Sequence, residues 1–181
     1  AVSAAAAALS LPAKAASPEA ENKSIPTACS TQSGTVQGKA DGAHLVWYGI
    51  PYGAAPVGEA RWSAPLDPVP WTGSLDCTQP APVAYQFSTC PIGSEDCLRL
   101  DVYSVPSAHS RPVLVYLHGG NNQIGDSLEL PGGELVENDD CVFVSVNYRL
   151  GLFGFNCLPA LCSGGEATGN FALLDIAKAL D

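Results

Sequence analysis

Methionine is absent from all 181 residues, position 1 included. We therefore expect a chain that is processed, trimmed or incomplete at its beginning. Long apolar runs are also missing, since the Ala-rich residues 1–16 are shorter than the roughly 20 apolar residues that a transmembrane helix needs. The sequence predicts no membrane span.

Basic residues are scarce. Only 8 Lys and Arg stand against 18 Asp and Glu, which gives a net charge of −10 and a pI of about 4.5. Nucleic acids and anionic membranes are bound through basic faces, so the composition argues against both partners. Charged residues make up 14% of the chain and hydrophobic residues 46%, which suits strands that are buried on both faces.

Metal-binding cysteine spacing is missing too. The seven cysteines contain no Cys-x-x-Cys pair and no nearby histidines complete a zinc site, so the sequence implies no metal or cofactor. The run Ala13-Lys14-Ala15 resembles a signal-peptidase site, although a disordered Ala-rich leader is an equal alternative. A secreted chain would favour disulfides and would make Asn22, in an Asn-Lys-Ser sequon, a glycosylation candidate.

Residues 1–32 are predicted to be a signal-like, flexible leader, and residues 33–181 to be part of one domain. Short apolar pieces broken by glycine predict an antiparallel hairpin over residues 34–52. Apolar runs predict strands over residues 98–105, 112–117 and 141–148, a short helical turn within 130–138, and a helix over 169–180 with Asn170 as its cap. This order predicts an α/β sheet with an antiparallel leading edge.

The first chemically informative segment is residues 118–122 (HGGNN), directly after a predicted buried strand. Acyl transfer needs hydrogen-bond donors aimed at the oxygen that becomes negative, and glycines let backbone N–H groups come close to it. His118-Gly119-Gly120 matches the HGGG-type oxyanion loop of esterases and lipases. By itself, a simple Gly-Gly turn is an equal reading.

Four further segments resemble, in order, blocks of the type-B carboxylesterase and cholinesterase family. Residues 49–62 resemble its GIPYA…PPVG…RF block, 94–102 (SEDCLRLDV) its SEDCLYLNV signature, 144–155 its NYRLG-FGF block and 169–175 (GNFALLD) its GNxGLLDQ block. The resemblance runs from about Gly34 to the C-terminus. It implies an α/β-hydrolase fold, of which this chain is the N-terminal part: a mostly parallel central sheet with an antiparallel leading hairpin, in an incomplete domain.

The resemblance also implies an activity, the hydrolysis of small-molecule carboxylic esters by a Ser–Glu/Asp–His triad. It makes the backbone N–H groups of Gly120 and Asn121 two donors of the oxyanion hole, while His118 and Gly119 shape the loop. The third donor would follow the catalytic serine. It further implies two structural ion pairs, Arg61 with Glu95 and Arg149 with Asp175.

A family disulfide would join Cys97 to Cys90, with Cys77 as the competing partner. Cys157–Cys162 and Cys29–Cys77 are further candidate pairs, and Cys141 is the expected free thiol, a small buried hydrophobe.

Three features depart from the family. Asn121 replaces the third glycine of the loop, and Asn122 replaces an aromatic residue. The chain ends at Asp181, before the Gly-x-Ser-x-Gly elbow that carries the nucleophile, and neither Ser163 nor Ser107 has elbow context.

The two histidines outside the loop, His44 and His109, are expected at the surface. We expect the chain alone to be inactive and to need the C-terminal remainder of the domain. Three readings stay open: part of an active secreted carboxylesterase, a non-catalytic cholinesterase-like binding or adhesion protein, and a truncated product without function.

Overall fold

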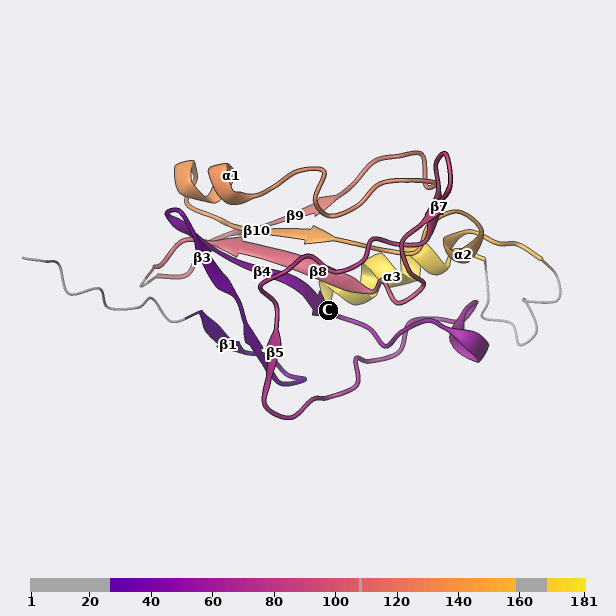
Figure 1. Cartoon of the computed structure of the whole chain (residues 1–181), viewed down its shortest axis with the longest axis horizontal. Helices are drawn as coiled ribbons and strands as arrows, with labels where there is room; N and C mark the ends of the chain where they lie inside the picture. The colour runs from indigo at the N-terminus through magenta and orange to yellow at the C-terminus, as the bar shows by residue number, and fades with distance from the viewer. Residues whose placement is uncertain (1–26, 108, 159–168) are drawn as a thin grey trace, which may run out of the picture.

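A five-stranded sheet runs through the computed structural model, which describes residues 27–107, 109–158 and 169–181 (Figure 1). Its strand order is β3-β4-β8-β10-β9. The bounds are β3 Lys39–Asp41, β4 His44–Pro51, β8 Arg99–Ser104, β9 Val113–Leu117 and β10 Val142–Val146. Only β9 and β10 pair in parallel, and the other three pairings are antiparallel. The predicted α/β sheet is confirmed, with an antiparallel part larger than one hairpin.

Smaller elements surround this sheet. A second sheet holds β1 (Ala28–Ser30), β2 (Thr35–Gln37) and β5 (Ser74–Asp76), and β6 (Gln86–Phe87) pairs with β7 (Pro91–Ile92). The helices are the 3-10 turn η1 (Gly58–Ala60), α1 (Gly133–Asn138), α2 (Gly151–Gly154) and α3 (Phe171–Leu180). Because Ala28–Ser30 pairs with β2, folded structure begins earlier than the predicted boundary at residue 33.

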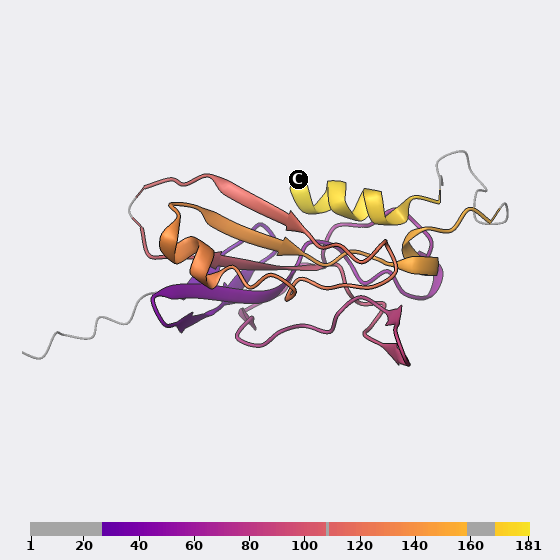
Figure 2. The ribbon, with the colours of Figure 1, turned by 90° about the horizontal axis from the view of Figure 1, so that it is seen from above.

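The two faces of the sheet are covered by different helices. Side chains alternate along β10, so Phe143 and Val146 belong to separate apolar clusters. Val136 of α1 packs in the cluster of Phe143, and Ala172 of α3 packs in the cluster of Val146. Figure 2 shows the two helices on opposite sides of the strands. Asn170 occupies the N-cap position of α3 as predicted, but its side chain makes no capping hydrogen bond.

The buried ion pair between Arg149 and Asp175 joins α3 to the end of β10. Arg149 Nη2 lies 2.7 Å from Asp175 Oδ1, and the two side chains are 2% and 0% exposed. The same guanidinium donates to the carbonyl oxygens of Arg61 and Ser63. These contacts hold the segment after η1 against the sheet.

The expected pair of Arg61 and Glu95 is also present, but nearer the surface. Arg61 Nη2 donates to Glu95 Oε1 at 2.9 Å, and the two side chains are 34% and 23% exposed. The bond from Glu95 raises the pKa of Arg61. The Arg61–Glu95 pair joins the segment after η1 to the segment before β8, in keeping with a structural role.

In the structure all four cysteines of the candidate pairs Cys90–Cys97 and Cys29–Cys77 are free. In each pair one cysteine is exposed and the other is buried in the core. Burial raises the pKa of Cys97 to about 12 and that of Cys77 to about 11, which keeps these thiols protonated. Cys141 is free and buried, as predicted. The pairing of Cys157 involves Cys162, which lies outside the described residues.

Strand β9 is an edge strand, since it pairs only with β10 among the described strands. Three of its five residues expose large apolar side chains, Val113, Leu114 and Leu117. An apolar strand with unpaired backbone groups is a template for pairing with another chain. The structure therefore contains an exposed apolar sheet edge.

We expect residues 1–181 alone to associate through this edge. Changing Leu114 to Lys should reduce association in light scattering, because a charge on an edge strand opposes strand pairing. Leu130→Lys is the matched control, since Leu130 is a loop residue that is 45% exposed against 49% for Leu114. A monomeric wild-type chain with a sharp, cooperative unfolding transition would contradict the prediction.

Replacing Arg149 with Met should lower the free energy of unfolding by about 3–5 kcal/mol, because it leaves the buried Asp175 carboxylate without its partner. The same change at Arg61 should lower it much less, since that pair is partly solvated. Urea denaturation followed by tryptophan fluorescence measures both. Equal losses at the two positions would show that burial does not control the effect.

Candidate oxyanion loop

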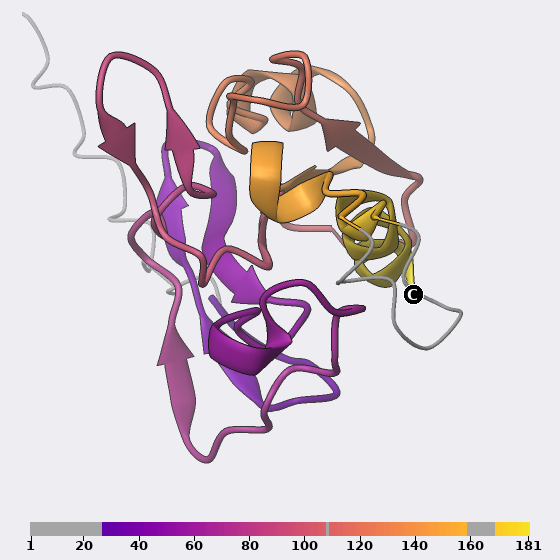
Figure 3. The ribbon, with the colours of Figure 1, turned by 90° about the vertical axis from the view of Figure 1, so that its right-hand side faces the viewer.

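The segment after β9 leaves the sheet at the carboxyl ends of the two parallel strands. Figures 1 and 3 show α2 and the β6–β7 hairpin near the same end of the molecule. In this segment residues 119–124 are exposed, while His118 and Gly125 are buried. We call residues 118–125 the loop. It is an exposed arc with two buried ends.

Left-handed backbone shapes the exposed arc. Gly120 has φ +99°, and Asn121 and Asn122 have φ of 56° and 61°. Asparagine tolerates this region better than most residues, so the departure from glycine at position 121 is accommodated. The arc is closed by hydrogen bonds from the N–H groups of Gln123 and Ile124 to the carbonyl oxygen of Gly120.

Position 120 requires glycine for two reasons: its positive φ, and the lack of room for a Cβ atom. A Cβ atom at this position would lie 1.9 Å from the carbonyl oxygen of Ile124, which is backbone and has little room to move. Asn122 also accepts a hydrogen bond of 2.7 Å from the N–H of Gly151, the first residue of α2. The arc is thus a tight turn held against α2.

The first end of the loop rests on Tyr148. The His118 ring stacks on the Tyr148 ring with 4.4 Å between centroids, and the Tyr148 hydroxyl donates to the His118 carbonyl oxygen at 2.7 Å. Burial raises the pKa of Tyr148, so its hydroxyl stays protonated and able to donate. His118 Nδ1 lies 2.9 Å from the carbonyl oxygen of Gly119. His118 shapes the loop, and no described serine lies in hydrogen-bond contact with its ring.

The second end of the loop is held by Gln86 from β6. The Gln86 amide accepts a hydrogen bond from the N–H of Gly125 at 3.0 Å and donates to its carbonyl oxygen at 2.9 Å. Gly125 leaves room for His118, because a Cβ atom there would lie 2.3 Å from His118 Nδ1.

Two buried side chains hold Ser127, just beyond the loop. Its hydroxyl donates to Asp101 Oδ2 at 2.6 Å and accepts from Asn147 Nδ2 at 2.9 Å, while its N–H donates to Asn147 Oδ1 at 3.0 Å. Asp101 Oδ1 also accepts the N–H of Gly49 at 2.7 Å. Burial raises the pKa of Asp101, and the bonds from Ser127 and Gly49 oppose that rise.

The two expected donors on the arc are unengaged. No hydrogen bond within the described part of the chain uses the N–H of Gly120 or of Asn121 as its donor. Unpaired N–H groups on a rigid, exposed turn can stabilise a developing negative charge on a substrate oxygen. Oxyanion stabilisation is therefore the chemistry that the arrangement suits.

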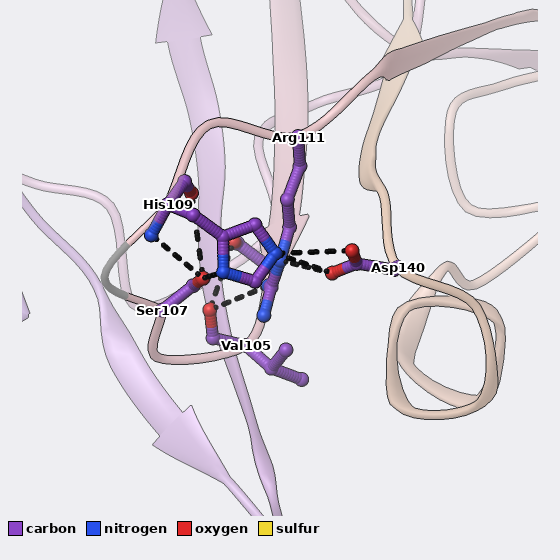
Figure 4. A network of polar contacts seen from close by, with 6 residues as sticks. Val105, Ser107, His109, Arg111 and Asp140 are labelled. Carbon is purple, nitrogen blue, oxygen red and sulfur yellow. Dashed lines mark hydrogen bonds and ion pairs between the residues drawn. The ribbon is translucent and has the colours of Figure 1, made fainter.

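A second group of polar residues, Ser107, His109, Arg111 and Asp140, lies at the far end of β8 and β9 (Figure 4). Ser107 Oγ lies 3.1 Å from His109 Nδ1, and His109 Nε2 lies 3.0 Å from Asp140 Oδ2. His109 is 63% exposed, as expected from the sequence, and the Asp140 pKa is lowered chiefly by His109. The Ser107 hydroxyl also accepts the N–H of His109, as in a surface turn. These contacts connect the loop between β8 and β9 to the loop between α1 and β10.

His44 is not the surface residue that the sequence suggested. Its side chain is 15% exposed, and its Nδ1 lies 2.7 Å from Glu137 Oε1 of α1. Among the described residues no group of three or more His, Cys, Asp or Glu side chains has the geometry to hold a metal ion. No helix in the same part of the chain is long and apolar enough to cross a bilayer. Asn22 and Ser163 lie outside the described residues.

Sequence reasoning missed Gln86 and Ser127, which hold the second end of the loop. Neither lies in a recognisable motif, and each acts through a partner 39 or 20 residues away in the chain. Asp101 and Asn147 do lie within motif blocks, Asp101 in the middle of β8 and Asn147 directly after β10. The motif blocks contain these two residues, but the sequence did not indicate that both bind Ser127.

The chain is similar to known esterases over most of its length. The family model described as "Carboxylesterase family" matches residues 23–181. Carboxylesterase 3B of Mus musculus is 39% identical over 154 residues, covering 75% of this chain and 26% of that protein. The para-nitrobenzyl esterase of Bacillus subtilis is 38% identical over 163 residues, covering 83% of this chain and 32% of that protein.

The fold of the chain is also similar to that of solved esterase structures. A thermophilic pNB esterase superposes with a TM-score of 0.79 at 37% identity, over 86% of this chain and 34% of that one. A carboxylesterase of Geobacillus stearothermophilus gives a TM-score of 0.77 at 38% identity, over 85% of this chain and 33% of that one. The chain thus spans about a third or less of the length of these relatives. With its family motifs in order on an α/β-hydrolase sheet, the chain belongs to the carboxylesterase family.

Proposed function

We propose that this chain is the N-terminal part of a secreted serine carboxylesterase, which hydrolyses small-molecule carboxylic esters through an acyl-enzyme. In this proposal the chain supplies the oxyanion loop. The serine, the acid and the histidine of the triad come from the C-terminal remainder of the domain. The chain alone is then inactive, because oxyanion donors without a nucleophile give only residual assistance.

One observation carries the proposal: the unengaged N–H groups of Gly120 and Asn121 on a turn that is anchored at both ends. Donors fixed before the reaction need no reorganisation when charge develops on the substrate oxygen. In the proposed reaction a serine hydroxyl attacks the ester carbonyl carbon, the carbonyl oxygen becomes negative, and these N–H groups donate to it. Collapse expels the alcohol, and water then releases the acid.

The apolar edge of β9 gives independent support for a larger domain. Leu114 and Leu117 expose apolar surface beside unpaired backbone groups. In the proposal a further strand of the remainder covers this edge and brings the nucleophile to the carboxyl end of β9. Secretion is supported by the signal-like Ala13-Lys14-Ala15 and by the sequon at Asn22.

The proposal is tested on the full-length protein that carries this chain. It should release p-nitrophenol from short-chain p-nitrophenyl esters and lose this activity after treatment with an organophosphate. A protein without this activity, or without a serine at the Gly-x-Ser-x-Gly position, would overturn the proposal in favour of a non-catalytic role.

In that protein, Gly120→Ala should lower kcat by about 10²–10³-fold, since the added Cβ displaces the arc and its donors. Gly73→Ala is the matched control, because Gly73 also has a positive φ, +78°, but open space around its Cβ position. The control should retain kcat. Equal activity in the two variants would argue against a catalytic role for the arc.

A further inference from the structure

The loop owes little of its placement to contacts within its exposed arc. Residues 119–124 are all exposed, and their hydrogen bonds are the turn bonds to Gly120, the bond between Asn122 and Gly151, and the contact of the Gly119 carbonyl oxygen with His118 Nδ1. Apart from the bond to α2, the direction of the arc therefore depends on its buried ends.

The C-terminal end is the more heavily bonded of the two. Gln86 satisfies both backbone groups of Gly125, as a neighbouring strand would. Two residues later, Ser127 makes three hydrogen bonds to Asp101 and Asn147. The four side chains of this group are 2–7% exposed, so water does not compete for these bonds.

The partners come from three separate parts of the fold. Gln86 belongs to β6, Asp101 to β8, and Asn147 follows β10. Asp101 is fixed in turn by the N–H of Gly49 in β4, and the Asn147 carbonyl oxygen accepts the Tyr52 hydroxyl at 2.7 Å. The C-terminal end of the loop is thus connected by hydrogen bonds to residues in or next to the strands of the sheet.

We propose that Gln86, Asp101, Ser127 and Asn147 are positioning residues, which aim the N–H groups of the arc at the substrate oxygen in the transition state. This inference rests on the proposed function. Donors in an oxyanion hole work only near their productive geometry, and a shift of about 1 Å can lower the rate by about 10²-fold. None of the four residues touches the reacting atoms.

The test compares Ser127→Ala with Ser145→Ala in the full-length protein. Both serines are buried, at 2% and 0% exposure, but Ser145 Oγ has no hydrogen-bond partner among the described residues. Ser127→Ala should lower kcat by about 10- to 100-fold with KM little changed. Affinity for a trifluoromethyl ketone, which binds as an oxyanion, should fall by the same factor as kcat/KM. Ser145→Ala should match the wild type in both.

A purely structural role for Ser127 would act through the folded fraction. Thermal unfolding and active-site titration correct kcat for that fraction. If corrected kcat and ketone affinity of Ser127→Ala equal the wild-type values, the positioning role is overturned while the proposed function stands. If the wild-type protein hydrolyses no ester, the proposed function fails and this inference with it.

Gln86→Glu gives a second measurement should Ser127→Ala fail to fold. A carboxylate in place of the amide can still accept from the N–H of Gly125 but cannot donate to its carbonyl oxygen. It should show the same fall in kcat and in ketone affinity. Wild-type values for a folded Gln86→Glu protein would overturn the role of Gln86 in positioning.

Discussion

The buried guanidinium of Arg149 organises the end of the sheet at which the loop lies. A cation removed from water needs hydrogen-bond partners, and each side-chain nitrogen of Arg149 has one, from Asp175 or from the carbonyl oxygens of Arg61 and Ser63. These partners come from α3 and from the irregular chain after η1. The result is that segments far apart in sequence are locked around the end of β10.

The contacts of Arg149 also affect the loop, because the two residues just before Arg149 support the loop. Tyr148 stacks on His118, and Asn147 bonds Ser127, one at each end of the loop. The run from Asn147 to Arg149 therefore serves two purposes within three residues. Arg149 makes the buried ion pair in the core, while Tyr148 and Asn147 hold the two ends of the exposed arc. The N–H groups of the arc are left free at fixed positions.

Local pattern predicted much of this correctly. The strands at 99–104, 113–117 and 142–146 and the helix at 171–180 follow from apolar runs and spacing. Both ion pairs followed from resemblance to family blocks. The disulfides did not, because pairing depends on where sulfur atoms lie: Cys97 turned into the core while Cys90 stayed on an exposed hairpin. The partners of His44 and Ser127 could not be predicted from local pattern either, since each contact joins residues 20 or more positions apart.

By itself, the sequence determined the family, the order of the strands along the chain, and the glycine of the loop. These depend on side-chain type at short spacing: apolar residues bury, and only glycine fits the turn at position 120. Only the tertiary structure decided which polar groups meet. Gln86 on Gly125, and Asp101 with Asn147 on Ser127, are contacts between distant segments. Burial made those bonds obligatory, because a polar group removed from water must find its partner in the fold.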